Sequence, residues 1–108
     1  MTDAELVTAL KALGMPVTQG RPIDTPENPA PALPFITLRY VNSADLMADN
    51  QNAIEAGYRH VELYTKKKDP VSEKKMQDLL KSLSLPYLKL EAYIEAEKLR
   101  QIIYEINF

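Results

Sequence analysis

The sequence predicts an α+β fold in one domain spanning residues 1–108: an antiparallel β-sheet packed by two α-helices, with a long proline-rich loop. Apolar side chains recur at helical spacing near the N-terminus and again after residue 69, whereas other segments alternate polar and apolar residues. Prolines concentrate between these two patterns, in residues 20–34. The hydrophobic fraction of 45% and the charged fraction of 26% are typical of a folded globular domain.

The first predicted helix begins with a capping box made by Thr2 and Glu5. Gly14 is placed to end this helix in a left-handed conformation, and Pro16 prevents its continuation. Residues 15–19 follow as a short predicted strand. The apolar face of the helix comprises Leu6, Val7, Leu10 and Leu13.

Residues 20–34 are predicted to form an extended, non-helical arm. Proline fixes φ, removes a hydrogen-bond donor and biases its predecessor toward extended geometry. Two interpretations stay open: a flexible surface loop, or an arm that becomes ordered on a partner. On the second interpretation, deleting residues 21–32 leaves the domain folded but weakens assembly. Five of the eight prolines lie here: Pro22, Pro26, Pro29, Pro31 and Pro34.

Alternation predicts strands at residues 35–41 and 58–65, joined by a polar connection over residues 42–56 that is rich in turn-forming residues. Asp69 and Pro70 then predict the N-cap and first residue of a second helix. Its predicted buried face contains Val71, Met76, Leu79, Leu80 and Leu83.

The C-terminal pattern leaves two alternatives. Residues 87–94 alternate as a strand does, but residues 99–106 fit helical spacing as well as strand alternation. Local pattern alone does not choose between a terminal helix and a terminal strand that follows a turn at residues 95–98.

Composition excludes several kinds of function. A net charge of −2 and a pI near 5.4 argue against a dedicated nucleic-acid-binding protein. The absence of cysteine excludes disulfides, thiol catalysis and thiolate metal sites. No signal peptide or membrane-spanning run is recognised, and the absence of cysteine permits a cytoplasmic location.

The residues that could carry chemistry form no recognisable catalytic, cofactor or metal site. His60 is the only histidine and is expected to be an ordinary strand residue. Asp45, Asp49 and Asn50 lack EF-hand spacing and favour Asx-type turns over a cation site. We interpret the two remaining charged groups as solvated surface: Lys66, Lys67 and Lys68, which could alternatively contact a partner, and Glu91, Glu95 and Glu97.

Three blocks, in this order, resemble the tail-completion, or head–tail joining, proteins of long-tailed bacteriophages and prophages. They are residues 33–40 followed by Ala48-Asp49-Asn50, residues 61–65 followed by Lys68-Asp69, and residues 93–99 followed by Ile103-Tyr104-Glu105-Ile106. The match covers residues 33–108, and it favours a C-terminal hairpin of two antiparallel strands. The proline-rich segment is longer and denser in proline than the family pattern.

The resemblance implies a structural role without catalysis. Family members assemble as a ring, commonly a hexamer, between a head connector or portal-side protein and the tail-tube protein. DNA passes through the lumen without specific binding, and the free chain could be monomeric until it docks. The expected location is the virion, after synthesis in the bacterial host cytoplasm, with no membrane partner. The alternative is a small monomeric ligand-binding or regulatory module of a bacterium; an enzyme ranks last, because no glycine-rich phosphate loop or nucleophile–base pair is present.

Overall fold

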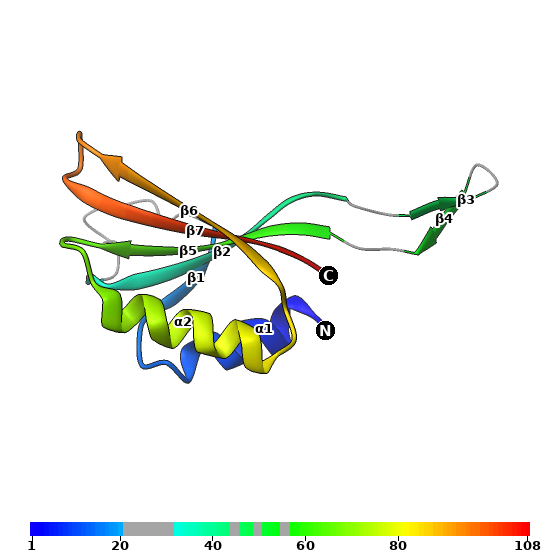
Figure 1. The fold of residues 1–108 in the computed structure, drawn as a ribbon, viewed down its shortest axis with the longest axis horizontal. Helices are drawn as coiled ribbons and strands as arrows, with labels where there is room; N and C mark the ends of the chain where they lie inside the picture. Colours follow the sequence, from blue (N-terminus) through cyan, green and yellow to red (C-terminus); the bar gives the residue numbers. More distant parts are fainter. Residues whose placement is uncertain (21–31, 44–45, 49–50, 55–56) are drawn as a thin grey trace, which may run out of the picture.

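A computed structural model describes residues 1–20, 32–43, 46–48, 51–54 and 57–108 (Figure 1). Two helices lie on one face of a five-stranded sheet, so the predicted α+β class is confirmed. The elements in chain order are α1 (Asp3–Lys11), β1 (Val17–Gln19), β2 (Phe35–Ser43), β3 (Leu46–Ala48), β4 (Gln51–Ile54), β5 (Gly57–Thr65), α2 (Pro70–Ser82), β6 (Tyr87–Ile94) and β7 (Leu99–Asn107).

The sheet has the strand order β1-β2-β5-β7-β6 and is mixed. Strands β2, β5, β7 and β6 pair antiparallel, as predicted, whereas β1 runs parallel to β2. Two further backbone bonds fix the short parallel strand: Ile36 N–H donates to the Pro16 carbonyl at 2.8 Å, and Gly20 N–H donates to the Leu38 carbonyl at 2.8 Å. These bonds extend the pairing of a strand that is only three residues long.

The two helices begin as the sequence predicts. The Thr2 hydroxyl accepts from Glu5 N–H at 3.2 Å, and the Asp69 carboxylate accepts from Ser72 N–H at 3.1 Å. Gly14 adopts the left-handed conformation, with φ of 85°. The prediction that Val71 is buried was wrong: its side chain is 67% exposed, because the first turn of α2 turns Ser72 and Glu73 toward the sheet.

The core fills the space between the helices and the sheet. In β7, alternate residues point into the core and pack beside β5, and this pattern resolves the C-terminal ambiguity in favour of a strand. The turn at residues 95–98 places Lys98 at φ of 54° and joins β6 to β7. The buried cluster contains Leu6, Leu10, Ile36, Leu38, Val61, Leu63, Met76, Leu80, Leu85, Ile102, Tyr104 and Ile106.

Arg59 holds the two ends of the described chain together at one end of the sheet. Its Nε lies 2.6 Å from Asp3 Oδ1 in α1, and its Nη1 donates to the Phe108 carbonyl at 2.6 Å. The guanidinium carbon also lies 3.8 Å from the centroid of the Phe108 ring. This cluster fixes α1 against the sheet.

Residues 42–56 were predicted to be a polar connection, and this prediction was wrong. β2 continues to Ser43 beyond a register shift, and β3 and β4 pair antiparallel to form a separate two-stranded ribbon. The ribbon projects away from the body of the molecule (Figure 1). Antiparallel pairing within the ribbon satisfies its backbone hydrogen-bonding groups.

Two sequence-based predictions lie outside the described residues. Residues 21–31 of the predicted proline-rich arm are among them, and so are Asp45, Asp49 and Asn50. The arm and the Asx-type turns therefore stay predictions.

Candidate functional site

Glu62 is the centre of a polar network on the sheet face opposite the helices. It is 4% exposed, and its Oε2 accepts from the Thr37 hydroxyl at 3.1 Å and from the Tyr64 hydroxyl at 2.9 Å. Arg39 Nη2 lies 3.6 Å from the other carboxylate oxygen. Gln101 on β7 donates to the Tyr64 hydroxyl at 3.0 Å. The buried carboxylate is therefore satisfied by groups on β2 and on its own strand, β5, as a buried polar group requires.

His60 belongs to the same face and links three strands. Its Nδ1 lies 3.1 Å from Arg39 Nη2 on β2, and its Nε2 lies 3.3 Å from Glu105 Oε1 on β7. Because a guanidinium can only donate, Nδ1 accepts and the ring proton is on Nε2, facing Glu105. Both ring nitrogens thus have partners, and the arrangement makes His60 a cross-strand link, a role that the sequence did not predict beyond its position in a strand.

The strand at one edge of the sheet, β6, is long and accessible. It has eight residues, against three in the opposite edge strand β1, and its exposed large apolar side chains include Leu88, Leu90 and Tyr93. Strand alternation puts Leu88 and Leu90 on the face opposite the helices. Among the described residues, the outer side of β6 has no strand partner. Such an edge offers backbone donors and acceptors to another chain.

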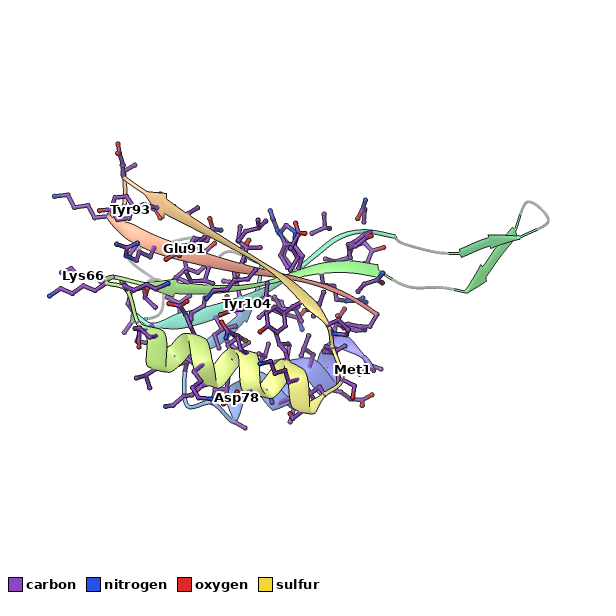
Figure 2. All side chains as sticks on the ribbon, viewed as in Figure 1. Met1, Lys66, Asp78, Glu91, Tyr93 and Tyr104 are labelled. Atoms are coloured by element: carbon purple, nitrogen blue, oxygen red, sulfur yellow. The ribbon has the colours of Figure 1, made fainter. Side chains whose placement is uncertain are left out.

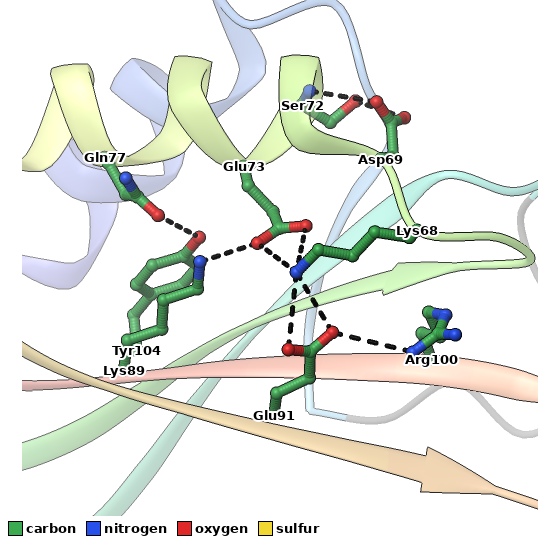
Figure 3. Close-up of polar contacts among 9 residues, drawn as sticks. All are labelled: Lys68, Asp69, Ser72, Glu73, Gln77, Lys89, Glu91, Arg100 and Tyr104. Carbon is green, nitrogen blue, oxygen red and sulfur yellow. Dashed lines mark hydrogen bonds and ion pairs between the residues drawn. The ribbon is translucent and has the colours of Figure 1, made fainter.

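The helix-facing side of β6 is tied to α2 by a charged cluster, shown in Figure 3. Glu73 in the first turn of α2 accepts from Lys89 Nζ at 2.6 Å and from Lys68 Nζ at 3.1 Å. Lys68 also donates to Glu91 on β6 at 3.1 Å, and Arg100 lies 3.7 Å from the same carboxylate. We call these five residues the Glu73 cluster.

Ionisation in the Glu73 cluster follows from these contacts. Burial disfavours the Glu73 carboxylate and is the largest single influence on it, but the hydrogen bonds from Lys89 and Lys68 together outweigh burial and lower its pKa. The hydrogen bonds to Glu73 and Glu91 raise the pKa of Lys68. Both groups therefore stay charged at neutral pH, and the first turn of α2 is held to β6 by ion pairs.

Two neighbouring groups complete the helix-facing polar layer. The hydroxyl and backbone N–H of Ser72 lower the pKa of Asp69 and hold it as the ionised N-cap of α2. Burial raises the pKa of the Tyr104 hydroxyl, which lies 3.3 Å from Gln77 Oε1 and stays protonated as a donor. Figure 2 shows Tyr104 between the sheet and α2.

The Lys66-Lys67-Lys68 turn separates into two parts. All three lysines are exposed, as the sequence predicted, but Lys68 alone turns back to the Glu73 cluster, a contact that the sequence did not predict. An open depression of about 330 Å³ borders all three lysines and also includes Leu33, Pro34 and Thr65. Lys66 lies at the same end of the molecule as Tyr93 (Figure 2).

Sequence reasoning also missed the role of Glu91. It was interpreted as solvated edge charge with Glu95 and Glu97, yet it pairs with Lys68 and approaches Arg100. A signal was available in the alternation of residues 87–94, which puts Lys89 and Glu91 on one side of the strand. The position of Glu73 one turn into α2, facing this side, could not be obtained from local pattern.

The described residues contain no group of three or more His, Asp or Glu side chains arranged to hold a metal ion. No helix in the described part of the chain is long and apolar enough to cross a membrane. Neither a protein-family model nor a curated protein sequence matches this chain.

Proposed function

We propose that this chain is a structural adaptor at the head–tail interface of a long-tailed bacteriophage or prophage. It works as an oligomeric ring between the head connector and the tail tube, around a channel for DNA. The proposal begins from the three sequence blocks that resemble tail-completion proteins. A mildly acidic chain also suits a channel through which DNA must slide, because basic residues would hold the phosphates.

The residues of these blocks have clear physical roles in the fold. Glu62 and Tyr64 form the buried centre of one sheet face, Asp69 caps α2 and Lys68 joins α2 to β6. Lys98 makes the turn of the C-terminal hairpin with its positive φ. The resemblance therefore rests on residues that specify this architecture, and this supports a shared fold more strongly than a shared assembly surface.

The observation that carries the adaptor proposal is the projecting β3–β4 ribbon. A two-stranded ribbon standing alone in water is marginally stable, so a ribbon that extends from a small domain is best explained by a surface on another molecule. In a ring, one patch of each copy must meet a different patch of its neighbour, and a projecting ribbon supplies the first patch.

The test replaces residues 44–56 with the dipeptide Asn-Gly. Ser43 and Gly57 face each other in the pairing of β2 with β5, so a two-residue turn can join them without disturbing the sheet. In a phage or prophage that encodes this chain, we expect the shortened protein to fold while heads and tails accumulate separately in electron micrographs.

The matched control is Val71→Ala, which alters an exposed helix residue and should leave particles intact. Deleting the whole chain gives the outer limit of the defect. Normal, infectious particles in the deletion strain would refute the adaptor function and leave the ligand-binding or regulatory module as the remaining alternative. Normal particles with only the shortened protein would refute the role of the ribbon.

A further inference from the structure

The edge strand β6 is complementary to a second copy of itself. When two β6 strands run antiparallel with Leu90 opposite Leu90, Lys89 faces Glu91 on both sides of the centre. The next pairs outward are Leu88 with Ala92 and then Tyr87 with Tyr93. In this register each charged residue faces an opposite charge, each apolar residue faces an apolar residue, and each tyrosine faces a tyrosine.

In this register the residues that face each other also lie on the same side of the joined sheet. Opposed residues in antiparallel strands point to the same side of the sheet. Lys89, Glu91 and both tyrosines lie on the helix-facing side, whereas Leu88, Leu90 and Ala92 lie on the other. The apolar pairs of the two copies would therefore form one continuous strip on the face opposite the helices.

The charged side chains on the helix-facing side of β6 have partners in the Glu73 cluster and are still accessible to a second copy. Lys89 contacts Glu73 at 2.6 Å, and Glu91 contacts Lys68 at 3.1 Å, yet the Lys89 and Glu91 side chains remain 34% and 39% exposed. Across the two-fold axis, the Lys89 of one copy meets the Glu91 of the other. Alternating charges then run from one Glu73 through both edge strands to the other Glu73, so no charge is left unpaired.

Neighbouring registers are disfavoured by the same side chains. Sliding the two strands by two residues in one direction places Lys89 opposite Lys89, and sliding them in the other direction places Glu91 opposite Glu91. Like charges directly opposite each other destabilise a strand pair. A slide of one residue would match the apolar side of one strand to the charged side of the other. Only the register centred on Leu90 satisfies all these pairs.

We propose that the free chain forms a symmetric dimer through antiparallel pairing of β6 with β6 of a second copy, in the register that places the two Leu90 residues opposite each other. The sheet would then continue through both copies, with the helices of both on the same side. This pairing closes at two copies and is independent of the adaptor proposal, which requires a different, ring-forming contact.

The first test uses the absence of cysteine in the chain. In the proposed register, Leu90→Cys places two thiols in directly opposed positions, where Cα separations of about 4.5–5.5 Å permit a disulfide. The matched control Leu88→Cys places its two thiols four residues apart in register, about 13 Å along the strands. Mild oxidation should cross-link Leu90→Cys and leave Leu88→Cys monomeric on a non-reducing gel.

The double variant Leu88→Cys/Ala92→Cys restores opposed thiols and should cross-link again. Equal cross-linking of Leu88→Cys and Leu90→Cys would refute the register. Sedimentation equilibrium of the unmodified chain gives the second test, and a dimer at micromolar concentration is expected. A monomer at every concentration would refute the dimer without bearing on the joining of heads to tails.

The third test is Leu90→Lys, which brings two ammonium groups together at the two-fold axis. Leu90 is 44% exposed, so the substitution should leave circular dichroism and the thermal midpoint nearly unchanged. The dimer dissociation constant should rise at least about tenfold. A folded Leu90→Lys variant that dimerises as tightly as the original chain would overturn the proposal.

Discussion

In the part of the chain that the structure describes, one glutamate is buried on each face of the sheet, and the two have different partners. Glu73 lies on the helix-facing side between two lysines, whereas Glu62, on the opposite face, accepts from two hydroxyl groups and has only a more distant arginine. On the helix-facing side the carboxylate joins separate elements, α2 and β6. On the other face it joins β2 and β5, which are already paired by their backbones.

The two faces of the sheet therefore differ in what they contribute: one mainly stabilises the fold, and the other is available for association. The helix-facing side contains the apolar core and the charged cluster that attaches the edge strand. The opposite face has a satisfied polar centre and exposed leucines on its outer strand. Substitutions on the first face should therefore act mainly on folding, and substitutions at the outer strand of the second face mainly on association.

The largest expected effect comes from adjacent residues that point to opposite faces. Ile102 is 1% exposed in the core, whereas Ile103, the next residue of β7, lies half-buried on the other side. Ile102→Ala should lower the free energy of unfolding by about 2–5 kcal/mol, because it removes core contacts and leaves a cavity. Ile103→Ala, its matched control, should cost about 1 kcal/mol. Urea denaturation measures both, and equal losses would mean that the two faces contribute alike.

Much of this comparison could be obtained from the sequence. The caps at Thr2 and Asp69 and the alternation in β5 and β6 are local signals that the structure confirms. They are local because a cap or an alternating strand depends on residues within one or two turns. The burial of Val71 was predicted incorrectly because helical spacing gives a stripe but not its edges.

Features that depend on distant pairing could not be obtained in this way. Lys68 and Glu91 are 23 residues apart, and only the packing of α2 beside β6 brings them to Glu73. The β3–β4 ribbon was missed because residues 42–56 lack the alternation of a half-buried strand, and ribbon pairing needs no such alternation. The self-complementary order of residues in β6 was visible in the sequence. It indicates a dimer only because β6 lies at the edge of the sheet, and that position could not be predicted from local pattern.

The second prediction concerns Glu73→Gln. An amide accepts one lysine poorly and cannot balance two, so the free energy of unfolding should fall by about 1–3 kcal/mol at neutral pH. The partial exposure of Lys68 and Lys89 limits the loss, because water can solvate both ammonium groups. Lys74→Gln is the control, because its exposed partner Asp78 lies on the outer side of α2, and it should cost less than about 0.5 kcal/mol.

The same variant has a pH signature. The folded-state pKa of Glu73 is lowered, so its contribution is present above the unfolded-state pKa and is lost as pH falls through the folded-state pKa. Between about pH 7 and about pH 3, the original chain should therefore lose more stability than Glu73→Gln, and the two unfolding curves should converge. Parallel pH profiles would show that the ion pairs of Glu73 contribute nothing.

Among the buried positions Ile102, Glu73 and Glu62, the smallest effect is expected for Glu62→Gln. The amide oxygen can still accept from the Thr37 and Tyr64 hydroxyls, and the Arg39 side chain is 54% exposed and can be solvated when its partner loses charge. The loss should therefore stay below about 1 kcal/mol, less than for Glu73→Gln. Glu62→Ala separates charge from hydrogen bonding, because it removes the carboxylate oxygen that accepts from both buried hydroxyls, and it should cost about 1–3 kcal/mol. If Glu62→Gln were as damaging as Glu62→Ala, charge would dominate on this face too, and the contrast between the two glutamates would be wrong.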